Sequence, residues 1–263
     1  MSSASQAGSD IVTLFAHRLT GMLETAAREQ AEQIAQAGSL IAKAVERGGL
    51  VHTFGTGHSH LLAEEIYSRA GGLLPVNVIE SAPLMLHEDA VASGQWERVS
   101  GVAQIMLEHA GIDPSRDMFI VISNSGRNAA PVEAAEWARA HGIPVVALTS
   151  LAHSRAETSL APSGKKLYEL ADVVLDNMGE PGDAVMELAP GLRSGSTSDI
   201  LGAFLLHAMV LSMAQQCLAQ GSQPPIITSG TVEGAREANH RMIASYQGRL
   251  SPAYERLRNR SQA

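Results

Sequence analysis

The chain has few cysteines and few basic residues, and each shortage excludes a class of protein. Its single cysteine, Cys217, excludes an internal disulfide and a zinc site built from cysteines. There are 19 Lys and Arg against 27 Asp and Glu, and the net charge of −8 argues against a nucleic acid as the main partner. A small anionic ligand stays compatible with this charge, because local backbone dipoles can hold it.

Targeting and membrane-spanning patterns are also missing. The first residues are small and polar, without the basic and apolar regions of a secretory signal. We find no apolar run long enough to cross a bilayer, which takes about 18 residues or more. We therefore expect a soluble, cytoplasmic protein with no membrane partner.

Apolar residues make up 45% of the 263 residues, enough for the core of one large domain. Short apolar segments alternate with helical patterns, which predicts an α/β fold with a parallel sheet covered on both faces. The predicted strands are residues 50–54, 74–79, 118–122, 143–148 and 173–176. The helices expected between them are residues 61–70, 102–109, 129–140 and 163–170, and residues 82–99 are expected to be loop with short helical turns.

We treat residues 1–263 as a single domain, because no linker-like segment divides the chain. Its expected parts are a disordered stretch at 1–10, a long N-terminal helix at 11–47, a core at about 40–220 and a C-terminal extension at 224–263. The N-terminal helix is either continuous or broken near Gly38. A Gly-rich segment follows the last predicted strand, and a hairpin at 184–188 is one interpretation of it. An apolar helix is expected at 199–218 and a last helix at 233–246.

Two loops follow predicted strands and contain glycine and hydroxyl residues. Residues 123–128, Ser-Asn-Ser-Gly-Arg-Asn, lead from a buried strand into a helix, so free N–H groups, the helix dipole and serine hydroxyls favour an anion there. An ordinary capped turn is the alternative. Residues 55–60, Gly-Thr-Gly-His-Ser-His, begin like a dinucleotide-binding fingerprint. The position of its third glycine is occupied by His60, so we do not expect NAD as a cofactor. The histidines of this loop could also ligate a metal.

Several carboxylates and histidines are candidates for chemistry. Glu64 and Glu65 face about 100° apart on the helix after residues 55–60, so one of them is expected to face the cleft. A carboxylate there could move the proton of an aldose–ketose shift, although a solvated charge at a helix start is the alternative. Asp199 and His207 are polar residues on broadly one side of the apolar helix, which makes them candidates for a site. The alternatives are that Asp199 only caps the helix and that His207 is an ordinary buried histidine. His240 belongs to a late polar cluster whose default interpretation is a solvated helix face.

Together, the loops at residues 55–60 and 123–128 resemble those of sugar isomerase (SIS) domains, which bind phosphosugars. The resemblance covers roughly residues 40–220, and it implies a three-layer αβα sandwich with a five-stranded parallel sheet. The Ser-His of the first loop, followed by Ala63-Glu64-Glu65, is similar to the phosphoheptose isomerases of that family, with a shorter spacing between the two motifs. SIS sites commonly form between subunits, so the resemblance also implies a homodimer or homotetramer.

The resemblance implies roles for particular residues. It makes Glu65 the base, gives His58, His207 or His240 the task of assisting ring opening, and places Asp199 and His207 where that isomerase has a Gln and a His. The implied substrate- or phosphate-binding residues are Gly57, Ser59, His60, Glu80, Ser123, Asn124, Ser125, Gly126, Asn128 and Asp199. A divalent metal such as zinc is a possible cofactor. Its candidate ligands are His60, Glu65, Asp199 and His207, although the Asp at 199 and a missing His before Ala63 depart from the family's metal site.

Three functions compete. The leading hypothesis is a sugar-phosphate isomerase that works through an enediol, with Glu65 as the base. The second is an etherase, lyase or deaminase acting on an amino-sugar phosphate, for which Glu65 and Glu80 would supply the acid–base pair. The third is a sugar-phosphate sensor without catalysis.

Overall fold

The apolar segments predicted as strands form one five-stranded parallel sheet. The structure is a computed structural model that describes residues 3–246 and 248–250. The strands are β1 (Val51–Gly55), β2 (Val76–Ile79), β3 (Met118–Ile122), β4 (Val145–Thr149) and β5 (Val173–Asp176). They lie in the order β2-β1-β3-β4-β5, and every neighbouring pair is parallel. The predicted α/β fold is confirmed.

The chain reverses its direction across the sheet between β1 and β3. From β1 it moves outward to β2, and it then returns to place β3 on the other side of β1. The carboxyl ends of these two strands are in register, with Gly55 opposite Ile122. In open α/β sheets, ligands bind outside the strand ends at such a reversal. The loops at residues 55–60 and 123–128 both begin here.

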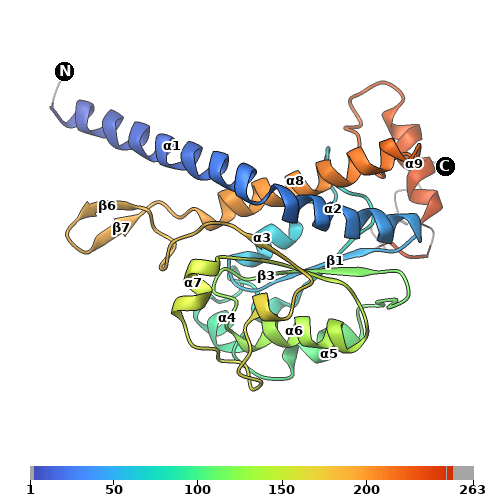
Figure 1. Ribbon diagram of the computed structural model, residues 1–263, viewed down its shortest axis with the longest axis horizontal. Helices are drawn as coiled ribbons and strands as arrows, with labels where there is room; N and C mark the ends of the chain where they lie inside the picture. The colour runs from blue at the N-terminus through green and yellow to red at the C-terminus, as the bar shows by residue number, and fades with distance from the viewer. Residues whose placement is uncertain (1–2, 247, 251–263) are drawn as a thin grey trace.

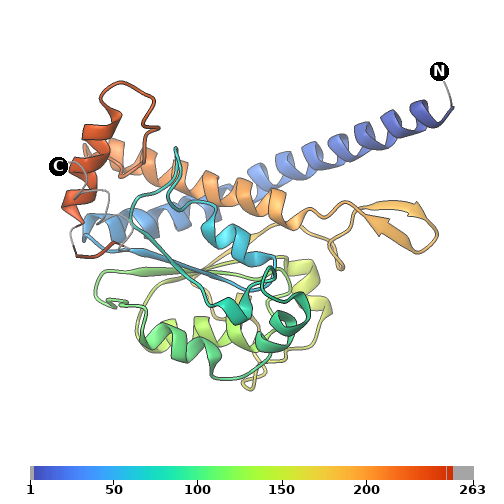
Figure 2. The ribbon, with the colours of Figure 1, turned by 180° about the vertical axis from the view of Figure 1, so that it is seen from behind.

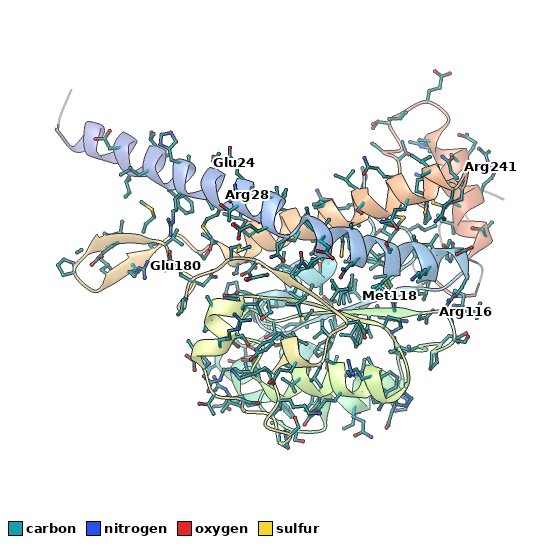
Figure 3. The ribbon with its side chains drawn as sticks, in the orientation of Figure 1. Glu24, Arg28, Arg116, Met118, Glu180 and Arg241 are labelled. Carbon is teal, nitrogen blue, oxygen red and sulfur yellow. The ribbon has the colours of Figure 1, made fainter. Side chains whose placement is uncertain are left out.

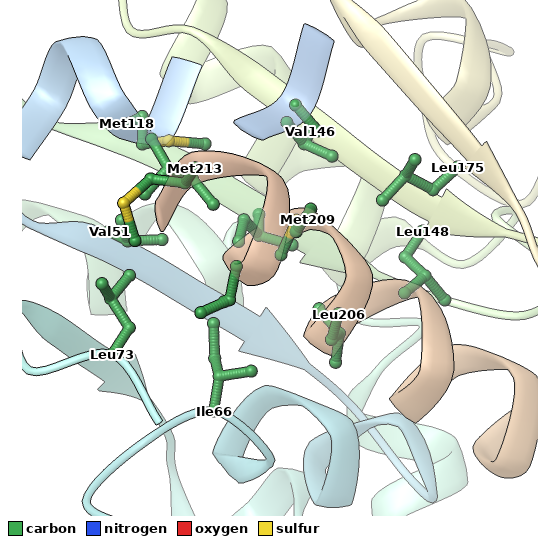
Figure 4. Packing of buried hydrophobic residues seen from close by; sticks show 14 of the residues in the cluster. Val51, Ile66, Leu73, Met118, Val146, Leu148, Leu175, Leu206, Met209 and Met213 are labelled. Carbon is green, nitrogen blue, oxygen red and sulfur yellow. The ribbon is translucent and has the colours of Figure 1, made fainter. Parts of the chain in front are cut away.

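Helices cover both faces of the sheet and give the predicted three layers (Figure 1). One face is covered by α2 (Ala31–Glu46), α3 (Ser59–Glu64) and α8 (Ser198–Ala219), and the other by α5 (Val102–Glu108) and α6 (Ala129–Ala140). Successive residues of β3 point to opposite faces, so Ile120 packs with the first group and Val121 with the second. Figure 4 shows the first core, where side chains of α8 such as Met209 meet those of the sheet.

Helix α1 (Ser3–Glu29) extends away from the three layers, and α2 follows after a break at Gln30 (Figures 1 and 2). The N-terminal helix is therefore neither continuous nor broken near Gly38, the two alternatives expected from the sequence. Gly38 lies within α2, where a Cβ atom would come within 2.8 Å of Ser212 Oγ on α8, so this glycine allows the two helices to approach closely. Of the residues 1–10, which were expected to be disordered, those from Ser3 onward belong to α1 in this structure.

The Gly-rich segment contains an antiparallel hairpin of β6 (Met186–Ala189) and β7 (Leu192–Ser194), slightly later than the expected 184–188. The hairpin extends to the same side of the molecule as α1 in both ribbon views (Figures 1 and 2). Glu180 lies at the base of this segment (Figure 3) and accepts hydrogen bonds from Arg18 of α1 at 2.5 Å and Arg193 of β7 at 2.8 Å. These bonds link the helix to the hairpin.

Helix α8 is long and apolar enough to cross a membrane when judged by length and composition alone. However, 44% of its most apolar window is buried inside the protein, and its buried side chains join the first core. This is how the core helix of a soluble protein also behaves. No other helix of residues 3–246 meets the same criteria.

The shorter helices differ most from the prediction. Helix α3 begins and ends earlier than the expected 61–70, and a 3₁₀ turn, η2 (Leu167–Glu169), stands where 163–170 was expected to be helical. The turns expected within 82–99 are η1 (Ala82–Leu84) and α4 (Ala90–Trp96). Helix α7 (Leu151–Ala156) was missed, since six residues give too little periodicity to detect. Helix α9 (Ala235–Ser245) packs through Ile243 against Leu50 and Leu74, which precede β1 and β2.

Candidate functional site

A cavity of about 470 Å³ lies at the carboxyl ends of β1 and β3. We call it the loop cavity, because both predicted loops line it. Its polar lining residues are Thr56, His58, Ser59, Ser93, Glu97, Ser123, Asn124, Ser125, Asn128, His153, Asn177, Asp183, Ser196, Ser198 and Asp199. The two loops therefore meet at one cavity.

The first loop turns sharply into α3. A Cβ on Gly55 would overlap the Ser59 carbonyl, and Gly57 has a φ of +57°, so both positions favour glycine. Ser59 is the first residue of α3, and with Gly57 and His58 it lines the cavity. The His60 ring instead folds back, with Nδ1 2.5 Å from the Gly57 carbonyl oxygen, and is absent from the lining. We conclude that His60 shapes the loop from behind.

The second loop exposes unpaired donors to the cavity. Gly126 has a φ of +56°, and its N–H donates to Ser123 Oγ at 3.2 Å, which closes the turn. Asn128 is the N-cap residue of α6, with an extended backbone and no side-chain cap bond. The N–H groups of Ser125 and Asn128, and the Ser125 hydroxyl, make no hydrogen bond to any residue that the structure describes. Such a set of free donors before a helix suits an anion.

Glu97, which the sequence analysis missed, connects the two loops. Its carboxylate accepts hydrogen bonds from Thr56 Oγ1 and from Asn128 Nδ2, both at 2.7 Å. Its carbonyl oxygen accepts one from the Ala130 N–H at 2.9 Å. Burial raises the pKa of Glu97, against the lowering effects of Thr56 and the nearby Arg98. No local pattern marks this residue, because its place depends on how the chain folds back after α4.

The floor of the cavity continues past β4 to β5. Asn124 Oδ1 accepts a hydrogen bond from Asn177 Nδ2 at 2.9 Å, and the Asn124 carbonyl accepts one from the Ser150 N–H at 3.0 Å. Asn177 is almost fully buried. A signal for Asn177 exists in the sequence, since it follows a predicted strand and therefore belongs to the same edge of the sheet as both loops.

Two carboxylates with different environments lie at the start of α8, Asp183 from the segment between β5 and β6 and Asp199 from the helix itself. Asp183 accepts hydrogen bonds from the Ser198 N–H at 2.9 Å and from Ser198 Oγ at 2.5 Å, so it caps the helix. Asp199 is half-buried, and its carboxylate makes no hydrogen bond to any described residue. Burial raises the pKa of Asp199, although His58 and His60 act in the opposite direction. Among the described residues, the lining contains no Lys or Arg.

Several predicted site residues lie outside this lining. Glu65 is hydrogen-bonded to His207 Nε2 at 2.9 Å and to Arg69, on the surface between α3 and α8. Glu80 interacts with Glu64 rather than with Glu65. The expected Glu65–Glu80 pair of the lyase hypothesis is therefore not formed.

His240 is also apart from the loops within one chain. It belongs to α9, which packs against residues that precede β1 and β2, while the loops follow β1 and β3. A second and larger cavity, of about 830 Å³, lies between α2, α8 and α9. We favour the loop cavity as the site, because the larger one contains no strand-end loop and its buried wall residues, such as Cys217 and Tyr246, are parts of the core.

The proposed metal ligands do not gather. Among the residues that the structure describes, no group of three or more His, Cys, Asp or Glu side chains could hold a metal ion. Of the expected ligands, Glu65 and His207 bond to each other, Asp199 lines the loop cavity, and the His60 ring folds back behind the first loop. The donor set does not fit zinc within one chain, and we derive no chemical step through a metal.

Comparison with known proteins agrees with this architecture. Residues 14–150 match the family model described as SIS domain. A UPF0309 protein of Geobacillus kaustophilus is 37% identical over 91% of this chain and 96% of its own length. A UPF0309 protein of Halalkalibacterium halodurans is 43% identical over 82% of this chain and 90% of its own length.

A solved structure supports the fold. The phosphoheptose isomerase of Neisseria gonorrhoeae superposes with a TM-score of 0.51 and 18% identity, covering 76% of this chain and 95% of that protein. At this identity, the likeness concerns the fold only. The family-model match and the curated relatives together show that the chain belongs to the SIS domain family, alongside the UPF0309 proteins.

Proposed function

We propose that this protein binds a sugar phosphate in the loop cavity and interconverts its aldose and ketose forms. The observation that carries the proposal is the set of unpaired donors at the second loop, on the topological reversal of the sheet. The Ser125 hydroxyl and the N–H groups of Ser125 and Asn128 would hold the phosphate, with Ser59 and Ser123 beside them. A volume of about 470 Å³ leaves room for the sugar chain.

The reaction needs a group that moves one proton between adjacent carbons. In an aldose, a base takes the C2 proton, the electrons form an enediol, and the proton returns at C1 while the hydroxyl proton moves from O2 to O1. Asp199 is the carboxylate of the loop cavity best suited to this step, because Asp183 and Glu97 already accept hydrogen bonds. His58, whose charge acts on Asp199, would transfer the proton between the oxygens.

Glu65 is the alternative base, on the strength of the family resemblance. It lies outside the lining of one chain, so it would serve the reaction only if a neighbouring subunit completes the site. We propose a cytoplasmic homodimer or homotetramer, with no nucleic-acid partner, in agreement with the SIS resemblance and the net charge of −8. Sedimentation equilibrium would measure the oligomeric state.

A panel of phosphorylated aldoses and ketoses tests the function. Ligands present far above their dissociation constants should raise the unfolding midpoint, since a hundredfold excess stabilises by about 2.7 kcal/mol. The binding sugar should then be incubated in D₂O, where isomerisation converts an aldose to a ketose or the reverse, with deuterium at C1 of the ketose or C2 of the aldose and no other change of mass. A product with lost water, lactate or ammonia would indicate elimination or deamination instead. Binding without any product would favour a sensor and overturn the enzymatic proposal.

A further inference from the structure

The Glu97 carboxylate occupies hydrogen-bond donors that border the anion-binding loop. Thr56 belongs to the first loop and Asn128 to the second, and each donates to a different oxygen of Glu97 at 2.7 Å. Asn128 also provides one of the free N–H groups of the cavity. One side chain therefore ties together the two loops that line the site.

We propose that Glu97 is an internal anion of the loop cavity, which must take up a proton or withdraw from Asn128 when a ligand anion binds. This inference rests on the proposed function only in treating the cavity as an anion site. A dianion held by the N–H of Asn128 would lie close to the carboxylate bound by the amide of the same residue. Like charges this close strongly disfavour each other's ionised forms.

The surroundings of Glu97 do not remove this conflict. The first loop adds His58, α7 adds His153, the segment between β5 and β6 adds Asp183, and the start of α8 adds Asp199. Among the residues that the structure describes, Arg98 is the cation that lowers the pKa of Glu97, and it is not part of the lining. Burial already raises the pKa of Glu97, so its protonation costs less than that of an exposed glutamate.

As a consequence, the affinity of the loop cavity for anions should depend on pH through the protonation of Glu97. Binding of a dianion should raise the proton affinity of Glu97, and by linkage the dianion should bind more tightly as the pH falls. In neutral form, Glu97 can still accept the Asn128 amide at its carbonyl oxygen Oε1, while its protonated Oε2 donates to Thr56 Oγ1, because a threonine hydroxyl can act as acceptor as well as donor. The loops would thus stay connected while the charge conflict disappears.

Sulfate is the suitable probe, because it remains a dianion across the pH range in which phosphate changes charge. We would measure its dissociation constant by calorimetry at constant ionic strength, at about pH 5.5 and about pH 8, for the full chain. Wild-type protein should bind sulfate at least about tenfold more tightly at the lower pH. Glu97→Gln should bind at least about tenfold more tightly than wild type at pH 8 and lose most of this pH dependence.

Two variants control the interpretation. Glu97→Asp keeps the charge and should retain weak binding at pH 8, whereas Glu24→Gln removes a charge on α1, outside the three layers (Figure 3), and should change nothing. If Glu97→Gln binds sulfate no better than wild type at pH 8, or keeps the full pH dependence, the proposal is wrong. Absence of sulfate binding to both proteins also overturns it, while turnover of a sugar phosphate would still support the proposed function.

A measurement on the wild-type protein alone covers the case in which Glu97→Gln fails to fold. Titrations of sulfate in buffers of different ionisation enthalpy give the number of protons taken up per sulfate bound. We expect net uptake of a fraction of a proton at pH values near or above the pKa of Glu97 in the free protein. No uptake at any pH between about 5 and 8 would contradict the inference.

Discussion

The Glu65 carboxylate lies 2.9 Å from His207 Nε2, outside the lining of the loop cavity, while the Asp199 carboxylate lies in that lining and bonds to none of the described residues. The two candidate bases therefore give different predictions. We expect Asp199→Asn to reduce deuterium exchange at C2 of the bound sugar by at least about a hundredfold, since general-base catalysis contributes about that much or more. Glu65→Gln should retain most of the exchange.

Both variants replace a carboxylate with an uncharged amide of nearly the same shape, so each serves as the matched control of the other. Sugar-phosphate affinity, measured in the same samples, should change little in either. If Glu65→Gln loses exchange and Asp199→Asn keeps it, the base is Glu65, and a neighbouring subunit must complete the site.

The Ser125 hydroxyl has no hydrogen-bond partner among the described residues, and we assign it to the phosphate. Ser125→Ala should weaken sugar-phosphate binding about three- to tenfold, the value of one hydrogen bond, or more because the acceptor is charged. Isothermal titration would measure the change. Ser163→Ala, on an exposed turn, is the control, and an equal effect in both variants would contradict the assignment.

Much of this site could be predicted from local sequence patterns. A fully apolar segment such as Met118–Ile122 predicts a buried parallel strand, and the Ser and Gly residues after it predict a strand-end turn. Because carboxyl ends of parallel strands share one edge of the sheet, the meeting of the two loops follows from this pattern. The position of Ser125 in the cavity needed no tertiary information.

Other members of the site could not be predicted because they depend on tertiary packing. Glu97 reaches Asn128 only because the chain after α4 folds back over α6, as the bond from the Ala130 N–H to its carbonyl shows. The angle of about 100° between the Glu64 and Glu65 side chains around the helix axis indicated that they lie in different environments. It did not indicate which of the two would face the cleft. In the structure Glu65 faces α8, and Glu64 faces Glu80.

The Glu64–Glu80 pair makes a prediction about stability and pH. The pKa of Glu80 is raised from 4.5 to about 7. Burial is the largest cause, and the hydrogen bond with Glu64 and the repulsion from its charge add to it. Because the folded pKa is the higher one, the folded state binds the proton more tightly, and stability is lost as the pH rises from about 4.5 to 7. Glu80→Gln should therefore raise the urea midpoint at pH 8 and change it little at pH 4.5.

Glu80 is substantially exposed, so solvent screening will keep this gain small. Glu88→Gln, at an exposed position of the same connection, is the control and should show no such difference between the two pH values. A Glu80→Gln variant that is equally stabilised at both pH values would show that ionisation of Glu80 is not the cause.

Gly126 is predicted to be intolerant of a side chain. Its φ of +56° is unfavourable for other residues, and a Cβ atom would lie 3.1 Å from Thr149 Oγ1 and from Ser154 Oγ. We expect Gly126→Ala to reduce the free energy of unfolding by about 1–3 kcal/mol. Gly164→Ala, at a φ of +71° with open space around it, should cost about 1 kcal/mol through backbone strain alone. Equal costs in urea denaturation would mean that the contacts behind the loop are unimportant.

At the opposite end of β3, Asp117 holds a buried cluster together. Its carboxylate lies 2.9 Å from His52 Nε2 and accepts hydrogen bonds from the Leu50 N–H at 2.8 Å and Arg249 Nη2 at 2.5 Å. Burial by itself would raise the pKa of Asp117, but the hydrogen bonds from His52 and the backbone outweigh it and lower the pKa. Its stabilising contribution is thus present above pH 3.8 and is lost as the pH falls through the lower folded pKa.

Replacing this carboxylate leaves Arg249 and His52 without their partner in the interior. We expect Asp117→Asn to reduce the free energy of unfolding at pH 7 by about 3–5 kcal/mol, the usual cost of breaking a buried charged pair. Urea denaturation followed by circular dichroism would measure it. Asp113→Asn, which removes a more exposed partner of Arg116, should cost much less. If the two variants are equally stable, the Asp117 cluster does not anchor the end of α9 to the sheet.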